Sequence, residues 1–147
     1  MCCVVAITAH YLLNKELLMP VTVERIPDQP IIILHYEGFL DLETAKSAFT
    51  QSAVLAASIE GKIYRIADVR NADSNFVEIV NIIKASRANV QGNAIDNKFQ
   101  VIFVGQNQLI HLYADTLKQL GAAPIPIFHT MEDAMHFIEL EQQKQSE

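Results

Sequence analysis

The sequence predicts a single α/β domain with a five-stranded, mixed but mostly parallel sheet and about four helices. Three observations lead to this class. The chain has 147 residues, the usual length of one domain. Half of the residues are hydrophobic, which is enough to bury a core without disulfides or metals. From residue 20 onward, short apolar runs alternate with segments of helical periodicity, as in parallel strands joined by helical crossovers.

Two strands open the predicted domain. Residues 21–26 alternate apolar and polar side chains, as a half-buried strand does. The Pro-Asp-Gln-Pro segment 27–30 predicts a tight turn, because proline and aspartate favour chain reversals. Residues 31–36 are mostly β-branched or aromatic and predict a second, more buried strand, which residues 37–38 should end. The short connection implies that the two strands pair antiparallel.

Helices and strands alternate after this pair. Asp41 is placed to cap a helix that runs to about Ser58, because apolar residues recur there every three or four positions. Residues 62–69 predict the third strand, and residues 70–74 a loop. A second helix is expected over residues 75–88.

The last third of the chain continues the alternation. Residues 99–104 form the most apolar run and predict a central strand that is covered on both faces. Asn107 should cap the third helix. Residues 125–128 predict a short last strand, which the neighbouring prolines place at an edge of the sheet. Thr130 should cap the final helix, which we expect to fray from Glu139 onward. The order is therefore ββαβαβαβα.

Residues 1–18 differ from residues 19–147, which we assign to the domain. Residues 2–13 are mostly apolar, but the run lacks the basic start and cleavage site of a signal peptide and is too short to span a bilayer. The extension could be a tail that packs on the domain, an interfacial helix, or upstream sequence joined by a misplaced start codon. The last alternative is favoured because Met19 closely precedes the first strand.

Composition and motifs exclude several classes of function. The formal net charge is -6, and the eleven lysines and arginines are scattered, so nucleic acid and acidic membrane surfaces are not expected partners. The two cysteines are adjacent at the N-terminus, which fits a reducing, cytoplasmic setting and leaves no cysteine nucleophile within the domain. Catalytic serine, P-loop, dinucleotide and zinc-helix motifs are missing. We therefore expect no enzyme, no metal and no cofactor.

Several segments resemble STAS-like domains of the SpoIIAA-like group, which includes anti-sigma-factor antagonists. The resemblance covers about residues 20–141. It rests on the element order and on the segments IADVR at 66–70, VIFVG at 101–105 and FHTMEDA at 128–134, which are similar to small uncharacterised bacterial members. Asp73 and Ser74 resemble the Asp-Ser pair whose serine is phosphorylated in the antagonists. The resemblance implies a regulatory or protein-interaction domain.

Two groups of polar residues are candidates for a site. Ser74 is a candidate phosphoacceptor, because phosphate at a helix N-terminus would meet free backbone N–H groups. The alternative is an ordinary helix cap, with Asn75 and Glu78 as a capping box. Residues near the ends of the third and fourth strands could bind a small anion or polar metabolite, since ligands of open α/β sheets bind at such ends. They are Asp68, Arg70, Asp73, Gln106 and Asn107. The alternative is ordinary loop residues with a local Asp–Arg pair.

The second helix is apolar on nearly all sides, which indicates either deep burial or a second interface. The candidate interface consists of Phe76, Val77, Val80 and Ile82, for a protein partner or a homodimer.

Two functional hypotheses remain. The first is a non-enzymatic regulatory or protein-interaction domain, switched by phosphate on Ser74. The second is a small-molecule or lipid-binding module with a pocket between sheet and helices. A deep apolar cavity with a few converging polar groups would favour the second hypothesis, and an exposed apolar second helix would favour the first.

Overall fold

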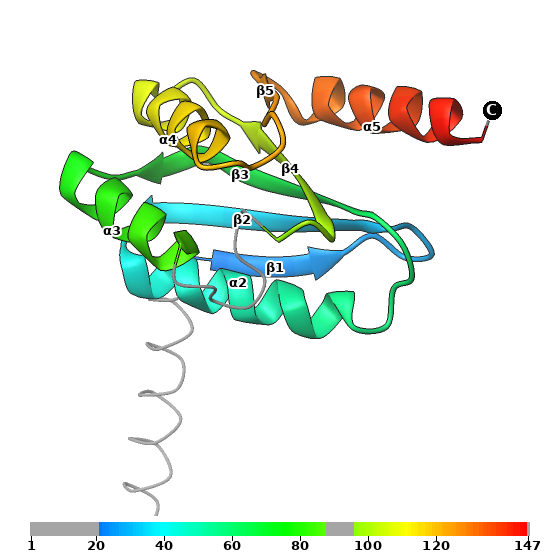
Figure 1. Ribbon diagram of the computed structural model, residues 1–147, viewed down its shortest axis with the longest axis horizontal. Coiled ribbons are helices and arrows are strands. Elements are labelled where there is room, and N and C mark those ends of the chain that lie inside the picture. The colour runs from blue at the N-terminus through cyan, green and yellow to red at the C-terminus, as the bar shows by residue number, and fades with distance from the viewer. Residues whose placement is uncertain (1–20, 88–95, 147) are drawn as a thin grey trace, which may run out of the picture.

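A five-stranded sheet forms the centre of the protein (Figure 1). The computed structural model describes residues 21–87 and 96–146. The strands are β1 (Val21–Arg25), β2 (Ile31–Phe39), β3 (Ile63–Asp73), β4 (Phe99–Val104) and β5 (Ile127–Phe128). They lie side by side in chain order; β1 and β2 pair antiparallel, and all later pairs are parallel. The mixed, mostly parallel sheet is therefore confirmed, and β5 lies at its edge.

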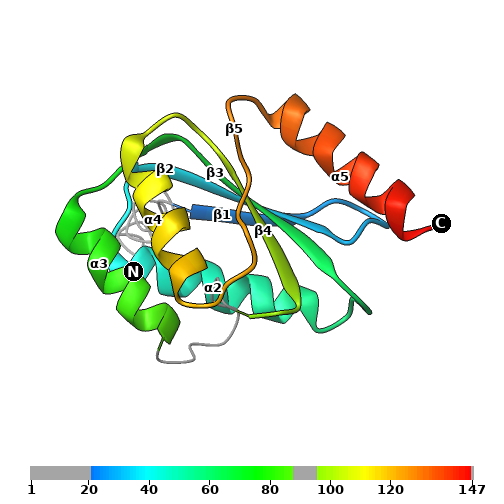
Figure 2. The same cartoon turned by 45° about the horizontal axis from the view of Figure 1, so that its top comes forward.

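Helices cover both faces of the sheet (Figure 2). They are α2 (Leu42–Ala56), α3 (Phe76–Arg87), α4 (Gln108–Gln119) and α5 (Met131–Gln145). Buried side chains of α2, α3 and α4 share one apolar cluster with the sheet, and α5 packs on the opposite face over β3, β4 and β5. The order ββαβαβαβα is thus confirmed. The residue 1–18 extension lies outside the described residues. Within them, no helix combines the length and apolarity needed to cross a membrane.

Three helices begin where polar caps are expected. The side chain of Asp41 accepts a hydrogen bond from the Thr44 amide at 2.8 Å, and Asn107 caps α4 in the same way. Thr130 accepts from the Asp133 amide at 3.1 Å. These bonds satisfy backbone N–H groups that have no partner within the helix.

The strands β2 and β3 are longer than expected. Residues 37–38 do not end β2, and most of the expected loop at residues 70–74 belongs to β3. Tyr36 lies opposite two residues, Val69 and Arg70, because the register shifts between His35 and Glu37. This β-bulge lets the two strands continue as a pair beyond the apolar core. The added residues are mostly exposed, so hydrophobic periodicity could not reveal them.

The final helix is also longer than expected. We expected fraying from Glu139, but α5 continues to Gln145. The Gln145 side chain donates a hydrogen bond to the hydroxyl of Tyr64 at 3.1 Å, which ties the last turn to the sheet. Ala134 and Ile138, both almost completely buried, pack the helix against the sheet. The polar residues from Glu139 onward, from which we expected fraying, face mainly toward solvent.

Candidate functional site

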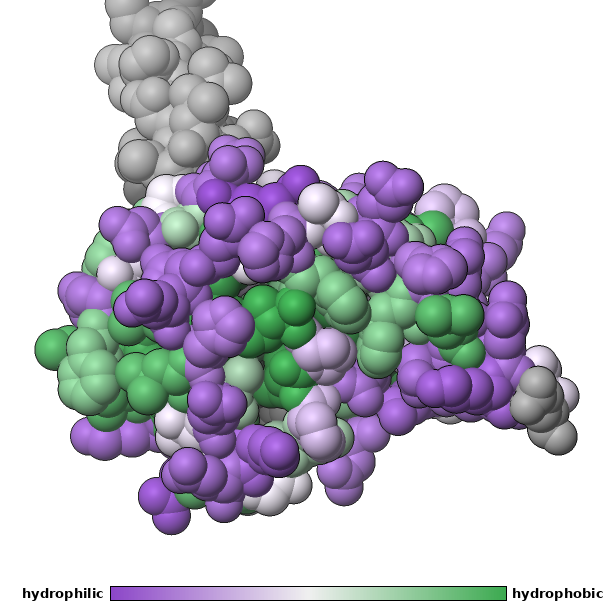
Figure 3. Space-filling view, turned by 90° about the horizontal axis from the view of Figure 1, so that it is seen from above, coloured by the Kyte–Doolittle hydropathy of each residue, from purple (hydrophilic) through white to green (hydrophobic). Residues whose placement is uncertain are grey.

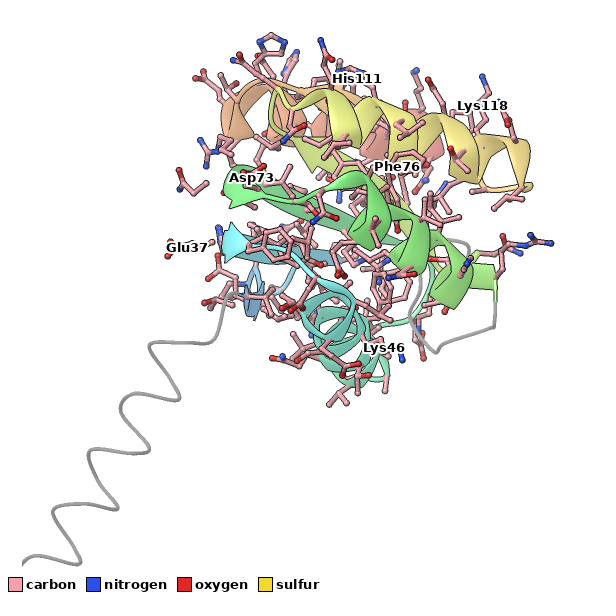
Figure 4. The ribbon with its side chains drawn as sticks, turned by 90° about the vertical axis from the view of Figure 1, so that its left-hand side faces the viewer. Glu37, Lys46, Asp73, Phe76, His111 and Lys118 are labelled. Carbon is pink, nitrogen blue, oxygen red and sulfur yellow. The ribbon has the colours of Figure 1, made fainter. Side chains whose placement is uncertain are left out.

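The candidate residues gather at the end of the sheet where β2, β3 and β4 finish. Figure 4 looks onto this end and shows Glu37 and Asp73 at the tips of neighbouring strands, with Phe76 on the following helix, α3. Because parallel strands finish at one edge, residues far apart in the chain meet here.

Ser74 connects two chain segments at this end. Its hydroxyl donates a hydrogen bond of 2.7 Å to the carbonyl oxygen of Leu40, and its amide donates to the carboxylate of Asp73 at 2.8 Å. The Leu40 amide in turn donates to the Asp73 carbonyl oxygen at 2.7 Å. Ser74 therefore fastens the start of α3 to the segment that leads into α2.

The expected capping box of α3 forms only in part. Asn75 accepts a hydrogen bond from the Glu78 amide at 2.9 Å, as a helix cap does. The Glu78 carboxylate accepts instead from the Leu42 amide of α2 at 3.0 Å. The segments that begin α2 and α3 are thus joined by three hydrogen bonds: from the Ser74 hydroxyl to Leu40, from the Leu40 amide to Asp73, and from the Leu42 amide to Glu78.

The candidate polar site is divided between the two faces of the sheet. Asp73 and Asn107 lie with Ser74 at the rim of a cavity on the face covered by α2, α3 and α4. Asp68 and Arg70 belong to a separate network with residues of β1 and β2. Gln106 is exposed on the loop before α4 and does not line the cavity. A single site formed by all five residues is therefore wrong.

The separate network centres on the Asp68 carboxylate. Arg70 donates to it from Nε and Nη2, each at 2.9 Å. His35 lies between two carboxylates, with Nδ1 at 3.3 Å from Asp68 and Nε2 at 2.9 Å from Glu24. The hydrogen bonds from Arg70 hold the pKa of Asp68 below its usual range, although partial burial opposes the shift. Asp68 thus remains ionised and orients Arg70.

The cavity on the other face has a volume of about 70 Å³. Its walls are mostly aliphatic and aromatic side chains from the sheet and from α2, α3 and α4. Three polar side chains, Tyr36, Arg65 and Tyr113, lie at depth, whereas the partly exposed Ser74 and Asn107 mark the rim. An apolar hollow with a few converging polar groups is typical of small-ligand sites.

Arg65 is the most unusual residue of the core. Its side chain extends from near the start of β3 and is only 1% exposed. Nη1 donates to the Ser52 hydroxyl at 3.0 Å, and the guanidinium carbon lies 4.3 Å from the centre of the Phe99 ring and 5.4 Å from that of Phe49. Burial lowers the pKa of Arg65, while the nearby Tyr36 and other groups partly restore it. The guanidinium stays charged in an apolar setting, because arginine does not lose its proton in proteins.

The candidate interface is exposed in part. Phe76 and Val77, in the first turn of α3, are 61% and 64% exposed. Figure 3 shows apolar side chains reaching the surface at this left-hand end of the molecule. Val80 is half-buried, whereas Ile82 is only 3% exposed and packs in the core, so its place in the interface is wrong. Phe39, at the end of β2, adds a third large apolar side chain that is 49% exposed. We call Phe39, Phe76 and Val77 the edge patch.

Several residues of the cavity and of the edge patch are not among the candidates that the sequence predicts. The charged Arg65, between the apolar residues Ile63 and Ile66 of the expected strand, is a signal in the sequence, because arginine is almost never fully buried without a partner. Phe39 is not predicted as a surface residue of a strand, because the sequence places the end of β2 before it. Tyr36 and Tyr113 look like ordinary core aromatics in sequence. Among the described residues, no group of three histidines or acidic residues could hold a metal ion.

Comparisons with known proteins bear on the fold. No protein-family model matches the chain, and none of the curated proteins matches it. An uncharacterised protein of the DUF3478 family from Shewanella loihica, described as having a SpoIIAA-like fold, is similar with a TM-score of 0.55 and 17% identity, over 80% of this chain and 90% of that chain. An anti-sigma factor antagonist from Mycobacterium paratuberculosis gives a TM-score of 0.47 and 17% identity, over 81% of this chain and 92% of that chain. The element order, the sheet topology and the first of these likenesses agree: the protein has the SpoIIAA-like fold.

Proposed function

We propose that this protein is a non-enzymatic regulatory domain of the cytoplasm that binds another protein through the edge patch. The observation that carries the proposal is the exposure of Phe76 and Val77, each more than half accessible, in one helical turn. Large apolar side chains that are exposed together cost free energy in water, and their burial stabilises a complex. Phe39 extends the same end of the domain through the pairing of β2 with β3.

The surroundings of the edge patch favour a particular chemistry of partner. Glu37 and Asp73 are exposed at the strand ends beside it, and Figure 4 shows them together. An apolar centre with an acidic rim complements a protein surface that has an apolar pocket and basic neighbours. A second copy of this chain would bring the same acidic rim to the interface, so a different protein is the better match.

Ser74 supplies a means of control next to the edge patch. The half-buried hydroxyl donates to Leu40, and phosphorylation would remove this donor and add about two negative charges beside Asp73. Repulsion and the larger volume of the phosphate would loosen the connection between α2 and α3. We expect the first turn of α3 to move as a result, which would weaken binding of the partner.

Two exposed valines allow a matched test of the binding surface. Val77 on α3 is 64% exposed, and Val54 on α2 is 70% exposed. Val77→Lys and Val54→Lys introduce the same charge at equally accessible helical positions. Each variant is cross-linked in the cells of origin, and the captured proteins are identified by mass spectrometry. We expect one partner to be recovered with the wild type and with Val54→Lys, and to be lost with Val77→Lys. Equal recovery with both variants, or capture of this chain alone, would contradict the proposal.

The control by Ser74 has its own readout. Intact mass measured on protein from the same cells should show a fraction heavier by one phosphate, and this fraction should vanish in Ser74→Ala. The heavier fraction should also be absent from the cross-linked complex. If the phosphorylated chain is captured as efficiently as the bare chain, the switch is wrong while the binding surface stands.

A further inference from the structure

The cavity arises from small side chains in the middle of the sheet. On the adjacent strands β2, β3 and β4, Ala67 pairs with Leu34 on one side and with Phe103 on the other, so a small side chain lies between two larger ones. Ala45 on α2 and Ala72 near the end of β3 also line the space. These side chains are too short to fill the gap between sheet and helices, and about 70 Å³ remains empty.

The polarity of the cavity changes with depth. Along β3 the lining residues run from Arg65 through Ala67 and Val69, and Ser74 follows directly after the strand ends. Arg65 is therefore the innermost of them along the strand, while Ser74 is at the rim. A molecule that enters at the rim would pass apolar walls before it reaches a positive charge.

The inner end suits an anion. Tyr36 and Tyr113 are buried beside Arg65, and burial raises the pKa of both phenols, so they remain neutral hydroxyl groups. The one carboxylate among the described lining residues is Asp73, which is exposed at the rim. The Asp96 carboxylate lies outside the lining but is close enough to interact with Arg65 electrostatically, so it offsets part of the guanidinium charge. An anion gains from the charge of Arg65 even while the guanidinium keeps its existing partners, Ser52 among them, because Coulomb attraction does not need a free donor.

The volume limits the size of the ligand. An apolar cavity of about 150 Å³ is known to bind benzene, so a space of about half that volume holds roughly three non-hydrogen atoms of similar packing. Because the cavity reaches the rim at Ser74 and Asn107, one or two further carbon atoms could extend toward the surface. The space is too small to enclose the acyl chain of a lipid.

We infer that this cavity binds a short-chain carboxylate of about two or three carbons, with the carboxylate toward Arg65 and the alkyl chain among the apolar walls. The site is distinct from the edge patch, because it uses the interior of the domain, and its binding is measured without any protein partner. A result that rules out propionate binding in the cavity would therefore leave the proposed protein-binding function standing, and loss of the protein partner would leave the cavity site standing.

Isoleucine methyl groups report on both faces of the sheet in one experiment. Ile79, Ile82 and Ile110 line the cavity, whereas Ile31 and Ile102 belong to the apolar cluster on the opposite face. The full chain is labelled with ¹³C at the isoleucine δ-methyl groups and titrated with sodium propionate against sodium chloride of equal ionic strength. We expect saturable shifts of the cavity methyls only. Shifts on both faces alike, or none at millimolar propionate, would overturn the inference.

Ligand analogues separate the roles of charge and size. Propionamide has the shape of propionate without the charge, and we expect it to bind about tenfold more weakly or worse. From acetate to propionate the affinity should rise about fourfold for the added methylene. Equal binding of propionamide would overturn the role of Arg65. A rise that continues at the same rate to octanoate would overturn the short-chain class and favour a lipid ligand.

A variant that fills the cavity completes the test. Ala67→Leu adds three carbon atoms beside Leu34 and Phe103 and should abolish the propionate-induced shifts. Val101→Ile adds one methyl group to another lining residue and should weaken binding if Ala67→Leu does not fold. Val54→Leu, on the exposed side of α2, is the control and should bind propionate as the wild type does. Unchanged binding in both cavity variants would place the ligand elsewhere.

Discussion

Replacing Asp68 by asparagine tests the polar network on the α5 side of the sheet. The Asp68 side chain is 8% exposed and accepts hydrogen bonds from Arg70 Nε and Nη2, each at 2.9 Å, and from the Arg70 amide at 3.3 Å. Asparagine has nearly the same shape but carries no charge, and it presents one oxygen in place of two. The substitution therefore removes the bidentate ion pair between Asp68 and Arg70 with little change in packing.

The magnitude follows from the burial of the two partners. A hydrogen bond to a charged group contributes about 1.5–3 kcal/mol when both partners are shielded from water. The Arg70 side chain is 44% exposed, so solvent screens the pair and lowers its contribution. We expect Asp68→Asn to reduce the free energy of unfolding by about 1–2 kcal/mol at neutral pH.

The pH dependence has a definite sign. Arg70 holds the folded-state pKa of Asp68 below its unfolded value of about 3.9. The contribution of the ionised carboxylate is therefore complete above the unfolded pKa and is lost as the pH falls through the folded pKa. The difference in stability between wild type and variant should be largest at neutral pH and should shrink in acid.

Urea unfolding followed by circular dichroism measures this difference at neutral pH and below pH 3. Asp115→Asn, on the exposed side of α4, is the matched control and should have little effect at either pH. If the two variants lose the same stability, or if the loss for Asp68→Asn is unchanged in acid, the ion pair with Arg70 does not stabilise the fold.

Three further substitutions test packing and capping, again by urea unfolding. Gly105→Ala would place a Cβ atom 2.9 Å from the Val69 side chain, and we expect a loss of about 1–3 kcal/mol from overpacking. Ser52→Ala removes the hydroxyl that accepts from Arg65 and should cost about 1–3 kcal/mol, because a buried charge loses a partner. Asn107→Ala removes the cap of α4 and should cost about 1 kcal/mol.

Two controls accompany these substitutions. Ser47→Ala, on the same helix as Ser52, removes a hydroxyl that is only partly buried. Gln108→Ala changes the exposed residue next to the α4 cap. Each should stay within about 0.5 kcal/mol of the wild type. Losses as large as those at Ser52 and Asn107 would show that the buried partner and the cap have no special role.

The fold could be predicted where burial leaves a periodic trace in the sequence. The apolar run 99–104 forms the whole of β4, which lies inside the sheet, and the caps Asp41, Asn107 and Thr130 begin helices as expected. The ends of β2 and β3 could not be predicted in the same way, since they extend beyond the core and are stabilised by pairing with each other. Backbone pairing between distant segments leaves no mark on hydrophobic periodicity.

The candidate site was harder to predict because it depends on which way each side chain points. Asp68 and Arg70 lie on one face of β3 and Ala67 and Val69 on the other, as strand alternation requires. The bulge opposite Tyr36 then shifts the alternation, so that Ala72 returns to the cavity side.

The two proposed binding sites share the helix α3. Ile79 and Ile82 form part of the cavity wall, while Phe76 and Val77 reach the surface one turn earlier. The Ser74 hydroxyl fixes the start of this helix and also lies at the rim of the cavity. A ligand inside and a partner outside would therefore act on one rigid element. If either moves α3, the coupling must be reciprocal, and the ligand must change the affinity for the partner by the same factor as the partner changes the affinity for the ligand.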